Sequence, residues 1–155
     1  MSARRRLACL AAAFLLASGF TAQPLDERTA QEMLPMSDDP VWTVLGAAPV
    51  SLDEQDGLYS IAFTDGVKAL EGKTLTITGF MLPLEAGETF RQFLLSKRTP
   101  TCAFCPPGEP NEMVYVVTLA PVAWDDGPIT VTGRFLLAND REMGLFYRLD
   151  EAALE

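Results

Sequence analysis

Two stretches of the chain alternate threonine with aliphatic residues, and this period of two restricts the possible folds more than any other feature. Residues 74–80 (TLTITGF) and 128–135 (PITVTGRF) share the pattern, and each carries a glycine close to its terminal phenylalanine. Such alternation puts polar side chains on one face of a strand and apolar side chains on the other. The sequence therefore predicts β-strands at both places, and strand-like composition predicts three more at residues 90–96, 113–119 and 145–149.

One short helix is predicted ahead of these strands, over residues 65–71. Val67 and Leu70 share a helical face there, Thr64 is placed to cap the first turn, and Gly72 is placed to end the last one. Residues 51–57 are predicted to form a solvated loop. A short helix followed by five strands, with glycines where strands must bend, predicts a mostly β domain. We expect a small five-stranded barrel of the oligonucleotide/oligosaccharide-binding (OB) type, with a simple β-sandwich as the alternative.

The N-terminal residues are typical of an export signal. Three arginines at residues 4–6 precede an apolar run at residues 7–20, which is shorter than the roughly 20 residues that span a bilayer. We predict a signal peptide over residues 1–22, a periplasmic location and no transmembrane segment in the mature chain; an uncleaved anchor is the alternative. Residues 23–41 are polar and acidic, which predicts an extended or disordered lead-in. Residues 42–155 are expected to form one domain.

The charge balance and the absence of histidine exclude several classes of function. The chain carries 21 Asp and Glu against 12 Lys and Arg, a formal net charge of −9, and removal of the signal would make it more negative. An acidic surface argues against nucleic acid or anionic lipid as a partner, because both require Lys and Arg to neutralise phosphate. Without histidine, a Ser-His-Asp triad is impossible and the commonest metal ligand is missing.

The mature chain keeps two cysteines, Cys102 and Cys105, in a proline-rich loop of sequence CAFCPPGEPNE. Their spacing permits a disulfide, a redox couple or two ligands for a soft metal. A disulfide is the default in an oxidising compartment, but loop-closure entropy gives a ring this small only about 2 kcal/mol. Redox chemistry is disfavoured because the prolines after Cys105 prevent a helix from running through the pair. In the same loop, Asn111 is predicted to cap its own turn.

A metal site needs ligands beyond two thiolates, and without histidine these come mainly from carboxylates. Glu112 is the predicted third ligand, and Glu109 and Glu85 are further carboxylates close to the loop or to a strand end. For copper(I), the sulfur of Met81 or Met113 would complete the set. Supporting residues also have structural alternatives, which are the more common roles: Met113 in the core at the start of a strand, and Glu109 and Glu112 as charges on a solvated loop.

Four segments carry specific motifs: residues 70–73 (LEGK), 77–84 (ITGFMLPL), 102–112 (CxFCPPGxPNE) and 128–133 (PIxVxG). Through them the chain resembles a bacterial family catalogued as domain of unknown function family 3299. Members look like exported, periplasmic or lipid-anchored proteins, often encoded near ABC-transporter components and in some cases in zinc-responsive gene clusters. The resemblance implies an accessory role in envelope metal homeostasis, with an ABC-type envelope transporter or its periplasmic component as partner.

The resulting hypothesis is an exported, non-enzymatic protein that binds or passes zinc, or another thiophilic metal, through Cys102, Cys105 and Glu112. Two alternatives remain open. One is an OB-like interaction module whose cysteine loop is locked by a structural disulfide. The other, which is the enzymatic alternative, is a thiol–disulfide redox protein.

Overall fold

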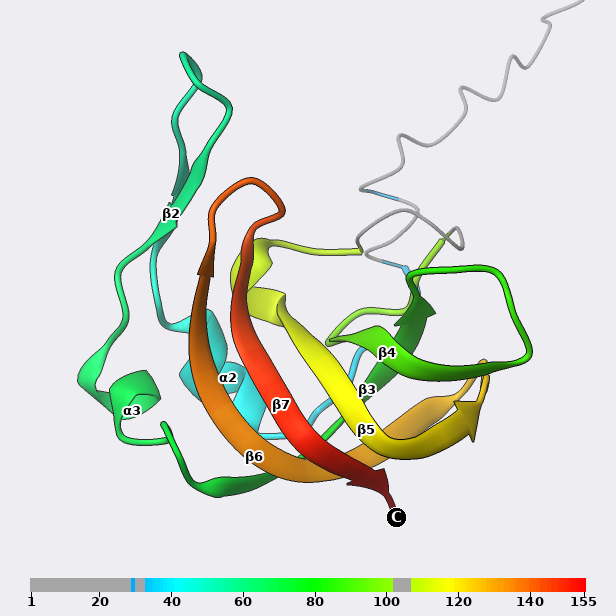
Figure 1. Cartoon of the computed structure of the whole chain (residues 1–155). Helices are drawn as coiled ribbons and strands as arrows, with labels where there is room; N and C mark the ends of the chain where they lie inside the picture. The colour runs from blue at the N-terminus through cyan, green and yellow to red at the C-terminus, as the bar shows by residue number, and fades with distance from the viewer. Residues whose placement is uncertain (1–28, 30–32, 102–106) are drawn as a thin grey trace, which may run out of the picture.

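The computed structural model describes residues 29, 33–101 and 107–155 and shows a mostly β protein with a few short helices (Figure 1). All five predicted strands are present, and four of them run further toward the C-terminus than the alternation indicated. They are β3 (Thr74–Pro83), β4 (Thr89–Ser96), β5 (Met113–Ala123), β6 (Pro128–Asp140) and β7 (Leu145–Leu154).

These five strands form a closed barrel in the order β3-β4-β5-β7-β6, and β6 pairs with β3 to complete the circle. Every neighbouring pair is antiparallel except β5 and β7, which run parallel with Tyr115 opposite Arg148. Because the strands close into one sheet, the two-sheet sandwich considered as an alternative is not their arrangement.

The hydrophobic core fills the barrel and includes residues from two short helices outside it. Strand residues such as Ile77 are fully buried, as the alternation predicts. Helix α2 (Val41–Gly46) adds Trp42 and Leu45 to the same core. Tyr147 ties this helix to β7, because its buried hydroxyl donates a hydrogen bond to the Leu45 carbonyl at 2.9 Å. Trp42 and Leu45 therefore join helix α2 to the core of the barrel.

Residues just before helix α2 complete one edge of β3. The ladder between β3 and β4 begins only at Phe80, so Thr78 lies beyond its end. The Thr78 carbonyl accepts hydrogen bonds from Ser37 Oγ (2.6 Å) and Trp42 Nε1 (2.7 Å). Its N–H donates to Asp39 Oδ2 at 2.8 Å. The end of the segment predicted as a lead-in thus packs on the barrel in place of a neighbouring strand.

The helices are short, and α3 (Asp65–Lys68) ends earlier than the predicted residues 65–71. Its predicted cap is confirmed, because Thr64 Oγ1 accepts a hydrogen bond from the Val67 N–H. Beyond the helix the chain continues in tighter turns, such as the one closed by Leu70 N–H on the Val67 carbonyl, until Gly72 adopts a φ of 75°. No helix in the described part of the chain is long and apolar enough to cross a membrane.

The predicted solvated loop at residues 51–57 is partly a strand, so that prediction is wrong at its start. Strand β1 (Val50–Leu52) pairs antiparallel with β2 (Tyr59–Ile61), and the hairpin extends away from the barrel (Figure 1). Each strand has only three residues, which is too short for an alternating pattern to be recognised. The Ser51 and Ser60 hydroxyls are 2.8 Å apart across the pair.

Candidate functional site

The loop that contains the predicted cysteine site connects β4 to β5, and its two ends are hydrogen-bonded to each other. Ser96 at the end of β4 faces Met113 at the start of β5 in the ladder between these strands. One step further along, the Lys97 N–H donates a hydrogen bond to the Glu112 carbonyl at 3.1 Å. Residues 98–111 therefore leave and re-enter the barrel at neighbouring positions.

Glu112 binds both cations at the start of this loop. Its Oε1 lies 3.1 Å from Lys97 Nζ, and its Oε2 accepts a hydrogen bond from Arg98 Nε at 2.7 Å. The Glu112 side chain is only 12% exposed. Burial raises its pKa, but the hydrogen bonds and positive charges of Arg98 and Lys97 outweigh this effect, so the pKa of Glu112 lies below its ordinary value of 4.5. We call these three residues the Glu112 clamp.

Two further residues of the loop motif have structural roles beside this clamp. A Cβ atom at Gly108 would lie 2.8 Å from Glu112 Oε2, which is closer than carbon and oxygen approach in proteins. Glycine at this position therefore leaves room for the carboxylate. Pro110 is buried and opens the short 3-10 helix η1 (Pro110–Glu112), where a missing N–H costs nothing.

Asn111 joins the loop to helix α2. Its side-chain Nδ2 donates hydrogen bonds to the carbonyls of Ala48 (2.9 Å) and Gly46 (3.2 Å). Carbonyls at the end of a helix lack partners within it, so an amide donor from elsewhere is well placed there. The prediction that Asn111 caps its own turn is therefore wrong.

The residues predicted as metal ligands lie in different surroundings. Cys102 and Cys105 are outside the described residues. The Met113 side chain packs with Leu82 and Leu94 in a small buried cluster, in agreement with its alternative role as a core residue. Within residues 29, 33–101 and 107–155, no three His, Cys, Asp or Glu side chains are grouped so that they could hold a metal ion.

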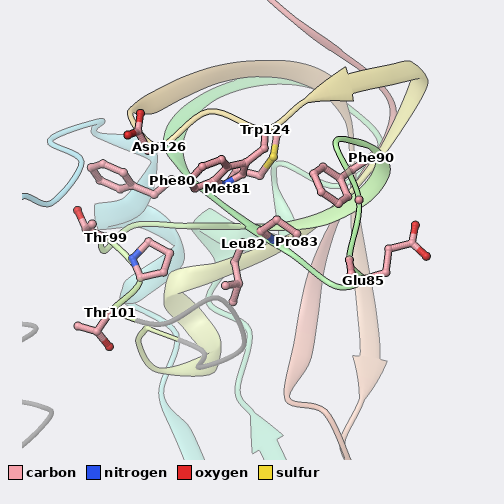
Figure 2. A pocket seen from close by; sticks show the side chains of 13 residues that line it. Phe80, Met81, Leu82, Pro83, Glu85, Phe90, Thr99, Thr101, Trp124 and Asp126 are labelled. Atoms are coloured by element: carbon pink, nitrogen blue, oxygen red, sulfur yellow. The ribbon is translucent and has the colours of Figure 1, made fainter.

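Met81 and Glu85, also considered as ligands, line a surface groove that sequence reasoning missed. Its volume is about 640 Å³, and Figure 2 shows its side chains from close by. We call it the Trp124 groove; its lining includes Phe80, Met81, Pro83, Phe90, Thr101 and Trp124. These residues come from β3, β4, the chain after β4 and the β5–β6 connection. No single sequence pattern contains these residues. The one sequence feature that could have indicated the groove is Trp124, a large apolar residue directly before a turn.

Comparison with known proteins supports the family resemblance. The family model described as "Protein of unknown function (DUF3299)" matches residues 27–155, which include the Glu112 clamp and the groove. The chain belongs to the DUF3299 family. This membership confirms the resemblance inferred from the four sequence motifs.

A solved structure also shares the fold of this DUF3299 chain. It is the crystal structure of a DUF3299 family protein from Pseudomonas aeruginosa PAO1, with a TM-score of 0.52 and 24% sequence identity. The similarity covers 74% of this chain and 93% of that one. No curated protein matches the sequence.

Proposed function

We propose that this DUF3299 protein is an exported, non-enzymatic accessory protein that binds a thiophilic metal ion, zinc in the first instance, through Cys102 and Cys105. In this proposal it acts in the periplasm and passes the metal to an ABC-type envelope transporter or its periplasmic component. The observation that carries the proposal is the Glu112 clamp, which fixes both ends of the cysteine loop to the barrel.

The clamp weakens the explanation of the cysteines as a structural staple. The ends of residues 98–111 are already joined by the Lys97–Glu112 backbone hydrogen bond and by two ion pairs. A disulfide between Cys102 and Cys105 would close a much smaller ring inside this loop, for which loop-closure entropy is worth only about 2 kcal/mol. Chemical reactivity of the sulfur atoms is the better reason for the pair.

The clamp also changes the part that Glu112 plays in the proposal. Both of its carboxylate oxygens are engaged by Lys97 and Arg98, so a metal would have to share an oxygen with one of these cations and approach their positive charge. We therefore propose that the cysteines are the protein's ligands and that Glu112 positions their loop. Zinc usually takes four ligands. In this proposal water or the recipient protein supplies those that are missing, which suits a protein that passes its metal on.

The barrel is proposed as an OB-like scaffold for this loop. Its order β3-β4-β5-β7-β6, with a parallel pair between β5 and β7, is the basis for assigning it to that type. Folds of this kind present loops for binding, and the formal net charge of −9 argues against nucleic acid as the ligand.

Metal content measured by elemental analysis tests the proposal. Reduced protein, loaded with zinc under anaerobic conditions and freed of excess metal, is expected to retain about one zinc per chain. Cys102→Ser and Cys105→Ser should each lose most of it, because a single thiolate remains. Thr101→Ser is the matched control in the same loop and should retain the metal. Zinc content that is independent of both cysteines would contradict the proposal.

The same preparation distinguishes the two alternatives. A disulfide with a reduction potential below about −300 mV in protein isolated from the envelope would indicate a structural staple in an interaction module. A potential in the range of about −120 to −270 mV would indicate a thiol–disulfide redox protein. Either result, combined with an absence of bound metal, would replace the metal proposal.

A further inference from the structure

The Trp124 groove lies where two connecting loops of the barrel meet. Residues 84–88 join β3 to β4, and residues 124–127 join β5 to β6. The Trp124 N–H donates a hydrogen bond to the Glu88 carbonyl at 3.4 Å, which holds the two loops together. Each loop carries two carboxylates, and neither carries a lysine or an arginine. Both loops beside the groove are therefore acidic.

Aromatic side chains occupy the middle of the groove. Phe80 and Phe90 line it and are almost fully buried, whereas the large, apolar Trp124 is 55% exposed. Figure 2 shows Asp126 and Glu85 on opposite sides of these aromatic side chains. The volume of about 640 Å³ is in the range of sites that bind small molecules. The groove thus offers an apolar stretch of that size between two carboxylates.

These two carboxylates have no cationic partner within the part of the chain that the structure describes. No Lys or Arg from that part lines the groove or the adjoining hollow of about 390 Å³, which shares Phe80 and Asp126 with it. Neither Glu85 nor Asp126 forms an ion pair there. The groove therefore attracts cations and repels anions.

The arrangement of these groups narrows the class of cation. A metal ion requires several ligands grouped around one point, and among the described residues no three His, Cys, Asp or Glu side chains are grouped in this way. A cation with a single charge pairs with only one of the two carboxylates. Aromatic rings attract ammonium groups and also pack against methylene chains. A methylene chain with an ammonium group at each end therefore matches the groove best.

We propose that the Trp124 groove binds a linear aliphatic diamine. The methylene chain of the diamine lies against Phe80, Phe90 and Trp124, and its two ammonium groups reach Glu85 and Asp126. The exposed ring of Trp124 adds a cation–π contact. This proposal uses neither of the proposed metal-binding cysteines and stands apart from the metal function.

Calorimetric titration of the purified protein with straight-chain diamines, from putrescine to octamethylenediamine, tests this proposal. We expect one member of the series to bind most tightly, because its length matches the separation of the two carboxylates. The control is the monoamine with the same number of carbons. It should bind about threefold more weakly or worse, the scale of one exposed ion pair. Binding should also change the tryptophan emission, since Trp42 is 1% exposed and Trp124 is the accessible tryptophan.

Variants locate the binding on the protein. Glu85→Gln and Asp126→Asn should each weaken the diamine by about three- to tenfold. In either variant the diamine should also lose its advantage over the monoamine, because its second ammonium group has no partner. Trp124→Ala should abolish the change in emission and weaken the diamine by about threefold or more. Glu54→Gln and Glu71→Gln remove carboxylates at exposed positions outside the groove, and neither should change the affinity.

Three results would overturn the proposal. They are the absence of binding by every diamine in the series, equal binding of the tightest diamine and its matched monoamine, and equal effects of the groove variants and the control variants. The second result would identify a site for molecules with one charge or none. The third would indicate a general attraction of cations to an acidic protein.

Discussion

At the scale of single residues, the Glu112 clamp sets the electrostatics beside the cysteine loop. One carboxylate binds two cations, Lys97 and Arg98, at the start of that loop. Glu112 thus contributes to the proposed function by holding the loop and its cations in place.

Replacing Glu112 with Gln tests this structural role. The variant loses the negative charge between Lys97 and Arg98, and we expect the free energy of unfolding at pH 7 to fall by about 1–2 kcal/mol. Urea denaturation measures the change. Glu142→Gln removes an exposed carboxylate away from the loop and serves as the control. Zinc binding to Glu112→Gln should persist; its loss with the fold intact would restore Glu112 as a ligand.

The pH dependence of that difference follows from the lowered pKa of Glu112. A carboxyl group whose pKa is lower in the folded protein contributes stability above its unfolded pKa, and this contribution disappears as the pH falls through the folded value. The difference between wild type and Glu112→Gln should therefore be complete at neutral pH and shrink below about pH 4.5. A difference that stays constant down to pH 3 would show that the charge is not its cause.

Tyr147 provides a second test at this scale. Its hydroxyl is fully buried and donates to the Leu45 carbonyl, and burial raises its pKa, so the group stays protonated. Tyr147→Phe removes one donor from that carbonyl, which keeps the Ala48 N–H as a partner at 3.2 Å, and should cost about 1 kcal/mol in unfolding free energy. Tyr115→Phe, whose hydroxyl donates to Gln92 in an exposed pair, should cost about 0.5 kcal/mol or less. Equal effects in thermal melts would contradict the anchoring of helix α2 by Tyr147.

At the scale of elements, β3 contacts both the segment before helix α2 and the Trp124 groove. Its first half is completed by residues before helix α2, and its last residues form the edge of the Trp124 groove. Between these halves, Gly79 lets neighbouring backbone come close, since a Cβ there would lie 2.6 Å from the Ser96 carbonyl oxygen. The glycine is therefore required by packing against β4.

Gly79→Ala should destabilise the barrel by about 1–3 kcal/mol, because the added methyl group meets rigid backbone and the Trp42 ring at 3.1 Å. Gly66→Ala is the matched control: its Cβ would lie 3.5 Å from Val44 Cγ1, an ordinary contact, within helix α3. Alanine favours helix over glycine, so this control should be neutral or slightly stabilising. Differential scanning calorimetry of both variants checks the prediction. Similar losses in both would contradict it.

The elements that sequence reasoning found are those with a long periodic signal. The strands beginning at Thr74 and Pro128 alternate over many residues, and the alternation reflects a barrel wall with one buried face. The hairpin of β1 and β2 was missed because three-residue strands show no period. Helix α3 was predicted too long because its turn signals mark where the chain reverses at Gly72, not where helical hydrogen bonding ends.

At the scale of the whole molecule, the closed barrel brings together residues that the sequence separates. The cysteine loop and Glu112 are recognisable in the sequence because their residues are adjacent. The binding of Glu112 by Lys97 and Arg98 is not, because that contact depends on the pairing of β4 with β5. The Trp124 groove was also missed, since Trp124 and Phe80 meet only after β6 closes the barrel against β3.

The most direct test of the central claim is X-ray absorption spectroscopy of the reduced protein loaded with one equivalent of zinc. We predict about two sulfur ligands per zinc at about 2.3 Å, supplied by Cys102 and Cys105, with oxygen ligands at shorter distances. The sulfur signal should disappear when both cysteines are replaced by serine. A zinc shell that contains oxygen alone in the wild-type protein would contradict the account.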